Sequence, residues 1–471
     1  MASVDMKRSL AASKPVPVLI VYTIMVVLTV VAYFGVRWIG ETTLTTAAVV
    51  AETAAEAKPV KPVDHTIYHV LLALMIILIA GRVFGKLLSL VGQPQVIGEV
   101  VAGIALGPSL LGWLSPDAMN YVLPKQVLPY LGVIAQLGII LYMFLIGLEL
   151  NGSLLRKRAH ATIAISHASI IAPFLLGSIL SLGLYQELAP EGISFTIFSL
   201  FMGVAMSITA FPVLARILTD HNIEKTPLGI MAISCAATDD VTAWCLLALL
   251  VGFAHTSVAS AIAVMVLTVV YVLFMVMIAR PFVASWAQSR PEGTDSNGFA
   301  IALGAMLLSS LFTELIGIHA IFGAFLLGAI VPHESVIAKS LVNKLQDFVS
   351  ILFLPAFFAY TGMRTSIGLV STPWEWGVCA AIIVVATIGK FGATVLAARL
   401  LKVDWRSSAI LGALMNTRGL MELVVLNIGL DLGVITPTLF AMMVIMALVT
   451  TFMTTPMLRM LWKGEQLPAL A

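Results

Sequence analysis

The sequence predicts an all-α polytopic membrane protein with about 14 transmembrane helices, and three observations lead to this prediction. The 471-residue chain is 60% hydrophobic and only 11% charged, with a mean hydropathy of +1.04, which is typical of polytopic membrane proteins. Apolar runs of about 20 residues, long enough to cross a bilayer as helices, recur along the chain. Lys and Arg also gather in alternate connections between these runs.

The apolar runs divide the chain into successive spans separated by short connections. They lie near residues 16–36, 67–88, 94–114, 128–149, 161–185, 193–219, 227–253, 257–279, 298–316, 319–336, 348–368, 374–401, 407–430 and 435–462.

The distribution of basic residues predicts the orientation of the spans. Of the 26 Lys and Arg, Lys390 and Arg418 lie inside spans and 19 lie on the side that carries the N-terminus. Five lie on the other side: Arg37, Lys58, Lys61, Lys125 and Arg364. Because basic residues concentrate on the cytoplasmic side, both termini are expected in the cytoplasm. The expected location is the inner (plasma) membrane of a bacterium.

The N-terminal region is expected to add one helix to the main membrane domain. Residues 16–36 follow Lys7, Arg8 and Lys14 but form a run too long for an ordinary signal peptide. We therefore predict an extra transmembrane helix within residues 1–39 and an external linker over 40–65. The membrane domain proper is then 66–465.

Similar motifs occur in the same order in two parts of the chain. Residues 96–108 and 320–332 both carry Gly-x4-Gly followed by Pro; residues 144–150 and 360–365 share a glycine motif. A later span in each part is rich in hydroxyl and helix-breaking residues, at 207–212 and 416–419. The spans concerned would cross the membrane in opposite directions, so the pattern predicts two inverted repeats, about 94–253 and about 319–462.

Asp239 and Asp240 are the most informative residues, because they lie in the middle of an apolar run, 227–254. A carboxylate at the bilayer centre costs from about 3 to more than about 10 kcal/mol unless it is paired or hydrated. Two adjacent carboxylates would also repel each other if both were ionised. We therefore expect the pair to line a wet cavity and to bind a proton or a cation.

Polar and helix-breaking residues in other spans are candidates for the same site. Pro212 removes a backbone donor and frees a carbonyl near Ile208, with Ser207 and Thr209 beside it, although Pro212 alone could be a simple kink. Lys390 is either a structural partner of a carboxylate or a lysine that exchanges protons. Arg418 and Glu422, an i,i+4 pair, are either a structural ion pair or part of the transport machinery.

Other classes of protein are disfavoured by composition. The basic residues are scattered, which predicts no nucleic-acid partner, and Cys235, Cys245 and Cys379 lack metal-ligand spacing. No cofactor is expected. The lipid bilayer is the expected environment.

Four stretches together resemble the monovalent cation:proton antiporter-2 family: 92–103, 207–218, 237–244 and 416–423. The resemblance covers roughly 66–465. It implies two crossed broken helices, a mobile core domain and a dimerisation domain, and hence a homodimer. By position it makes Asp240 the ion-binding carboxylate, Asp239 its acidic neighbour and Lys390 the lysine paired with that neighbour. Many plant-type members have Asn-Asp where this chain has Asp239-Asp240.

We therefore expect a secondary active transporter that exchanges Na⁺ or K⁺ for H⁺. Asp240, Thr209, Ser207 and Thr238 are the expected ion ligands, because oxygen atoms suit hard cations. A cation channel and an organic-anion symporter of similar fold remain as alternatives. An intramembrane aspartyl protease is the enzymatic alternative, but it needs aspartates that face each other from different helices. An enzyme is therefore not expected.

Overall fold

The computed structural model describes residues 31–35, 38, 66–149, 159–220, 223, 226–254, 258–289 and 295–462. Within these ranges every regular element is a helix, which confirms the all-α prediction. Ten helical stretches there are long and apolar enough to cross a membrane, and Phe195–Ser207 and Ala320–Ile330 are shorter apolar helices. The predicted extra helix and linker, 1–39 and 40–65, lie outside the described residues, apart from 31–35 and 38.

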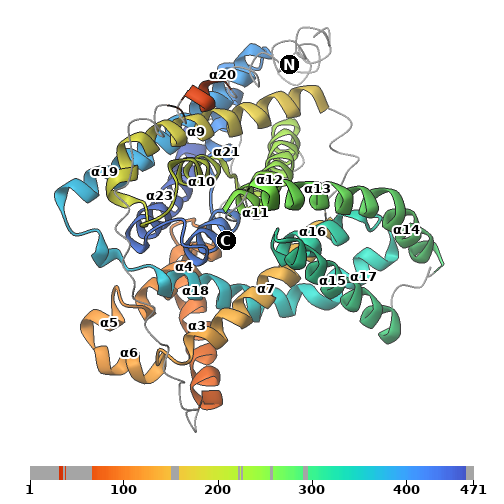
Figure 1. Ribbon diagram of the computed structural model, residues 1–471, viewed down its shortest axis with the longest axis horizontal. Coiled ribbons are helices and arrows are strands. Elements are labelled where there is room, and N and C mark those ends of the chain that lie inside the picture. The colour runs from red at the N-terminus through yellow and green to blue at the C-terminus, as the bar shows by residue number, and fades with distance from the viewer. Residues whose placement is uncertain are drawn as a thin grey trace.

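One set of helices, from the middle and the C-terminal part of the chain, packs together, and we call it the core group (Figure 1). It comprises α9 (Ala159–Leu188), α10 (Phe195–Ser207), α11 (Phe211–Asp220), α12 (Pro227–Ala254), α19 (Pro373–Thr387), α20 (Ala393–Leu400), α21 (Trp405–Met415), α22 (Leu420–Asp431) and α23 (Pro437–Leu461).

A second set, the scaffold group, lies beside it, with α3 and α4 below and α13 to α17 at the right of Figure 1. It comprises α3 (Thr66–Ser89), α4 (Gln95–Leu106), α7 (Leu128–Glu149), α13 (Val258–Phe274), α14 (Arg280–Gln288), α15 (Ser296–Ile316), α16 (Ala320–Ile330), α17 (Val336–Phe348) and α18 (Leu354–Arg364). The short helices α5 (Leu111–Leu114) and α6 (Pro116–Val122) connect α4 to α7.

Several helix boundaries differ from the predicted spans, and prolines account for two of them. Helix α4 ends at Leu106, before Pro108, and α16 ends at Ile330, before Pro332. The residue preceding each proline is extended, because the proline ring disfavours a helical conformation there. A third difference is that α17, a π-helical turn at Val349–Phe353 and α18 run on without a connecting loop, where the sequence predicts a span of 348–368.

Two helices of the core group are broken in the middle. Between α10 and α11, residues 208–210 are not helical, and Ile208 is extended, with φ −76° and ψ 139°. Pro212 is the second residue of α11, where its missing N–H leaves no hydrogen bond unmade. Between α21 and α22 the break includes Gly419, whose φ of +154° is rarely adopted by residues with a side chain. Both breaks occur where the sequence predicts interrupted helices.

The repeated glycines of the sequence form two close helix crossings in the scaffold group. Gly103 of α4 meets Gly362 of α18, and Gly147 of α7 meets Gly328 of α16. At all four positions a Cβ atom would lie less than 3.0 Å from the backbone of the opposing helix. Each crossing therefore joins one helix from the first predicted repeat to one from the second, with their backbones in direct contact.

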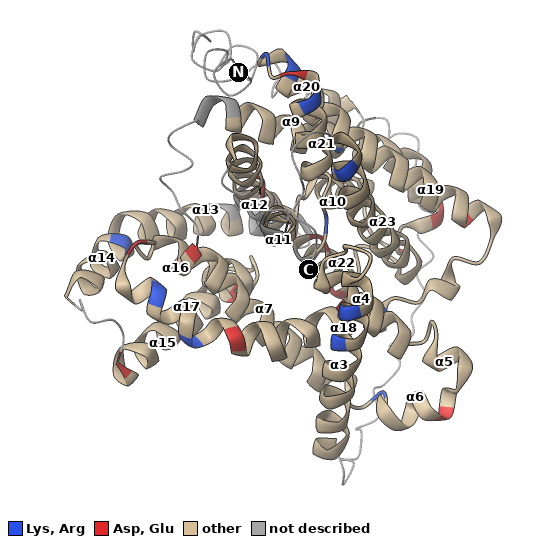
Figure 2. Ribbon diagram, turned by 180° about the vertical axis from the view of Figure 1, so that it is seen from behind, with Lys and Arg blue, Asp and Glu red and all other residues tan. Residues whose placement is uncertain are grey.

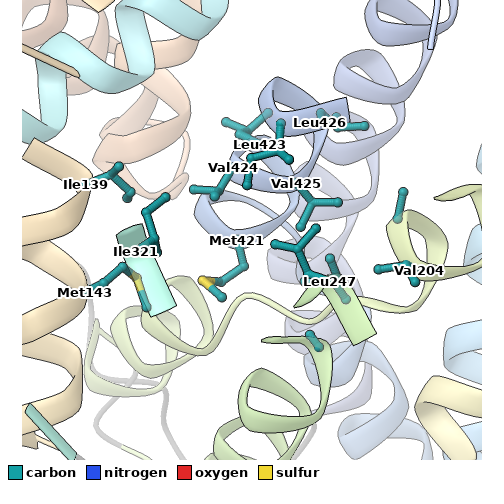
Figure 3. Packing of buried hydrophobic residues seen from close by; sticks show 14 of the residues in the cluster. Ile139, Met143, Val204, Leu247, Ile321, Met421, Leu423, Val424, Val425 and Leu426 are labelled. Carbon is teal, nitrogen blue, oxygen red and sulfur yellow. The ribbon is translucent and has the colours of Figure 1, made fainter. Parts of the chain in front are cut away.

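Apolar side chains separate the two groups near the breaks. Figure 3 shows Met421 of α22 between Met143 and Ile321 of the scaffold group on one side and Val204 and Leu247 of the core group on the other. All five belong to one buried cluster. Charged residues lie mostly at helix ends and in connections (Figure 2). Only a few charged side chains among the described residues are buried, and most of these lie near the helix breaks.

Candidate functional site

The two helix breaks touch each other, and this contact positions the site. The amide of Ala210, in the first break, donates a hydrogen bond to the carbonyl of Thr417, in the second, at 3.0 Å. The hydroxyl of Thr209 also contacts the carbonyl of Met415, at 3.3 Å. Non-helical backbone is thus buried within protein, as it must be at membrane depth.

Asp239 of α12 lies next to this contact and is fully buried. Its Oδ1 accepts a hydrogen bond from Ser166 at 2.5 Å. Its Oδ2 accepts from Thr209 at 2.6 Å, from Ser169 at 3.0 Å and from the Lys390 ammonium at 3.2 Å. With four donors, the Asp239 carboxylate is held in place and its charge is balanced.

Lys390 reaches Asp239 from a π-helical turn, Ile388–Gly392, between α19 and α20. Its Nζ also donates to the carbonyls of Ser169, at 3.2 Å, and Ser207, at 2.5 Å. All three donor positions of the ammonium are therefore used. π-turns inside α-helices are rare, and those that occur are often found at functional sites.

Asp240, the next residue, has the opposite surroundings. The residue is 2% exposed, yet neither carboxylate oxygen has a hydrogen-bond partner among the described residues. The backbone of Phe211, the first residue of α11, interacts with it electrostatically without reaching hydrogen-bond geometry. A buried ionised carboxylate without partners is costly, so Asp240 requires a proton or a cation.

The other predicted ligands do not surround Asp240 as the sequence led us to expect. The Thr209 hydroxyl donates to Asp239, and the hydroxyls of Ser207 and Thr238 donate to carbonyls of their own helices, each at 2.8 Å. Only the carbonyl of Ser207 joins the site, through Lys390. The expected set of residues is therefore brought together, but its hydroxyls surround Asp239 or bond locally.

Arg418 and Glu422 form a fully buried ion pair at 2.7 Å. Arg418 also donates to the carbonyls of Ala205, at 3.0 Å, and Met206, at 2.5 Å. Three successive carbonyls at the end of α10 thus accept hydrogen bonds from two buried cations, since Ser207 accepts from Lys390. Arg418 and Lys390 together offset the partial negative charge of this helix end.

Ser166 and Ser169 were not predicted as site residues. Both lie on α9 and point their hydroxyls at Asp239. Their spacing of three residues, which places them on one face of an apolar helix, was the available signal. Serine in a membrane helix usually bonds its own backbone, so the pattern by itself does not reveal a partner.

Comparison with known proteins identifies relatives over most of the chain. Residues 70–464 match the family model described as "Sodium/hydrogen exchanger, transmembrane". The Na⁺/H⁺ antiporter NhaS4 of Synechocystis is 44% identical over 397 residues, covering 83% of this chain and 97% of the relative.

Eukaryotic relatives are longer. Cation/H⁺ antiporter 17 of Arabidopsis thaliana is 42% identical over 406 residues, covering 85% of this chain and 49% of its own length. K⁺/H⁺ antiporter 1 of Saccharomyces cerevisiae is 33% identical over 385 residues, covering 79% and 44%. The chain spans about half the length of these two proteins.

Among solved structures, the chain is similar to the sodium proton antiporter MjNhaP1 from Methanocaldococcus jannaschii. The TM-score is 0.61 at 15% identity, covering 85% of this chain and 100% of the other. At this identity the likeness concerns the fold. The named relatives are all antiporters, and none of these comparisons points to an enzyme.

Proposed function

This chain belongs to the sodium/hydrogen exchanger family, and we propose that it exchanges a monovalent cation for protons across the membrane by alternating access. The observation that carries the proposal is the contrast between the two adjacent carboxylates. Asp239 is fully hydrogen-bonded, whereas Asp240 is buried with both oxygens unpartnered among the described residues. Asp240 is therefore the residue that takes a proton or a cation in turn.

A single carboxylate shared by both substrates explains obligatory exchange. Protonated Asp240 is neutral, and Asp240 with a bound Na⁺ or K⁺ is neutralised by the cation. Either loaded form crosses the apolar interface at Met421 at low cost, whereas empty, ionised Asp240 does not. Competition for one site then couples the two fluxes in opposite directions.

The pair formed by Asp239 and Lys390 supplies a second proton. When a cation arrives at Asp240, it attracts Asp239 and weakens the salt bridge to Lys390, now 3.2 Å long. Lys390, buried without its partner, then releases a proton, because an uncompensated buried charge is costly. Two protons exchange for one cation, so transport carries net charge.

The core group moves against the scaffold group in this proposal. The scaffold helices are joined by backbone contact at the glycine crossings, which favours movement at the boundary between the groups. The family resemblance supports a homodimer held together through the scaffold. The basic-residue bias supports cytoplasmic termini, and the bacterial relative supports a bacterial inner membrane.

The decisive experiment uses the purified protein in liposomes that contain a pH-sensitive dye, challenged with Na⁺, K⁺, Li⁺ and choline. We expect Na⁺ or K⁺, but not choline, to drive proton movement, and Asp240→Asn to abolish it. Asp117→Asn, which neutralises an exposed carboxylate in α6, is the matched control. Cation-driven proton movement at near wild-type rates in Asp240→Asn would contradict the shared-carboxylate mechanism.

The same experiment separates the two candidate cations. Relatives named for Na⁺/H⁺ and for K⁺/H⁺ exchange both match this chain, and the ligands are oxygen atoms in either case. The adjacent aspartates favour Na⁺ by a narrow margin. A lower half-saturating concentration for Na⁺ than for K⁺ is the expected result.

A further inference from the structure

Arg364, at the end of α18, makes a bidentate contact with α22. Its Nη2 donates to Oδ1 of Asp431 at 2.6 Å, and its Nη1 donates to Oδ1 of Asn427 at 3.1 Å. The sequence suggests only a solvated residue at the end of a span, but the Arg364 side chain is 22% exposed. The planar guanidinium matches two acceptors spaced one helical turn apart.

A second contact strengthens this connection. The amide nitrogen of Asn427 donates to the hydroxyl of Thr361 at 2.8 Å. The guanidinium of Arg364 also lies 5.5 Å from the ring centre of Tyr360. Two residues of α18, Thr361 and Arg364, are thus joined to two of α22, Asn427 and Asp431. We call these four residues the clamp.

The clamp joins the two helix groups rather than stabilising one of them. Helix α18 is fixed in the scaffold group by the glycine crossing with α4, whereas α22 belongs to the core group and follows the break that contains Arg418. Asp431 lies nine residues beyond Glu422, so it is about 14 Å further along α22. The basic-residue bias places this end of both helices outside the cell.

We propose that the clamp closes the external route to Asp240 and must break before the site faces the outside. Arg364 is then a positioning residue for transport, since it sets the balance between inward and outward access without touching the ion. This inference rests on the proposed antiport. A partly buried, bidentate pair is strong enough to change that balance about 5-fold, yet weak enough to open in every cycle.

The test measures access directly, without relying on transport. A cysteine is placed at Val424, on α22 between the break and the clamp, in the full-length protein with Cys235, Cys245 and Cys379 replaced by Ser. Val424 is buried at the boundary of the groups, facing Ile139 (Figure 3). Labelling by a membrane-impermeant thiol reagent from the outside should be slow, and should rise about 5-fold with Asp431→Asn.

A charge exchange makes the test specific for the ion pair. Arg364→Asp alone should label fast, and Arg364→Asp combined with Asp431→Arg should return labelling toward the parent rate, because the two charges can pair again. Asn427→Ala, which removes the acceptor for Arg364 and the donor to Thr361 but no charge, should give a smaller increase. Asp117→Asn should change nothing.

Transport provides the second readout. In liposomes, Asp431→Asn should lower the half-saturating concentration of external cation by several-fold while the maximal rate changes little or falls. Unchanged labelling and unchanged half-saturation, in a variant that still transports, would overturn the clamp. Faster labelling only from the cytoplasmic side would overturn it too. If the parent protein did not transport at all, the proposed function would be contradicted. The labelling experiment would still test the clamp, because it measures access and not transport.

Discussion

Asp239 and Asp240 are neighbours in sequence, yet one is surrounded by donors and the other has none among the described residues. Successive residues of a helix point about 100° apart, so one faces α9 and Lys390 while the other does not share those partners. This difference divides the work between them. Asp239 holds Lys390 through their salt bridge, and in the proposed mechanism Asp240 is the residue that binds the substrate.

Asp239→Asn should separate these two roles. The amide keeps hydrogen bonds with Ser166 and Thr209, but it carries no charge. The ammonium of Lys390 then lacks the negative partner that stabilises its protonated form. We expect exchange to continue at a reduced rate and its dependence on membrane voltage to weaken. Liposomes clamped at a set voltage with K⁺ and valinomycin, and driven by Na⁺, measure this.

Ser166→Ala is the matched control for that variant, because it removes one hydrogen bond from Asp239 and no charge. It should keep the voltage dependence of the parent. Wild-type rates that are indifferent to voltage would show one-for-one exchange and leave Lys390 with a structural role only.

The pairing of Asp239 with Lys390 could be predicted, but the serines around it could not. The resemblance supplied the pair, and the structure places the two groups 3.2 Å apart. Ser166 and Ser169 contact Asp239 across 73 and 70 positions of sequence. Ser169 also bonds its own helix, through the carbonyl of Ser166 at 2.8 Å. Nothing local therefore distinguishes these serines from ordinary serines of a membrane helix, which is why the sequence alone does not reveal them.

At the scale of helices, the positions of the breaks were predictable and the continuity of α17 with α18 was not. Pro212 and Gly419 mark the breaks, since one lacks an N–H and the other adopts a positive φ. Pro355 lies inside this continuous helix, directly after the π-helical turn Val349–Phe353, where the helical hydrogen-bond pattern changes and a missing N–H is more easily accommodated. From sequence, the same residue is compatible with the start of a new span.

Helix α21, which precedes the second break, begins with a side-chain cap that can be tested. The carboxylate of Asp404 accepts a hydrogen bond from the Ser407 amide at 2.8 Å. Asp404→Ala should destabilise the protein by about 1 kcal/mol, and Asp404→Asn by less, because asparagine caps helices almost as well. Thermal unfolding in detergent, followed with a thiol-reactive dye, measures both.

The pH dependence of this cap has a definite sign. Desolvation raises the pKa of Asp404, but hydrogen bonds from the backbone of Ser407 and Arg406 outweigh it and lower the pKa. The stabilisation is therefore complete above the unfolded pKa of about 3.9 and is lost as the pH falls through the folded value. Because an amide does not titrate, the stability difference between the wild type and Asp404→Asn should change over this range. A difference that stays constant below pH 4 would exclude this account.

At the scale of the whole molecule, the single shared site of the proposed mechanism predicts that transport is sensitive to pH. Protons and cations compete for Asp240 in the proposed mechanism, so the apparent affinity for the cation should weaken as the pH falls. Half-saturating Na⁺ or K⁺ concentrations measured in liposomes between pH 6 and pH 9 test this. A constant value over that range would indicate separate sites for the proton and the cation.

The fold was predicted from local sequence signals, and these signals do not report contacts between segments that are distant in the sequence. Hydropathy located the spans from 67–88 onward on described helices, with the shifts noted at α4, α16 and α18. The helix that begins at Val258 also continues through α14 to Gln288, past the predicted end at 279. It could not show which helices form the core group and which form the scaffold group. That division depends on side chains such as Met421, Ile321 and Leu247, which look alike in sequence.

The glycine crossings have a consequence for how the chain can be divided. Gly103 finds its partner in Gly362, and Gly328 finds its partner in Gly147, so each half of the chain supplies one member of both crossings. A half on its own would expose two flat, small-residue strips to lipid, each shaped for a helix it does not possess. Each half therefore depends on the other for its helix packing, and we do not expect either half to fold stably by itself.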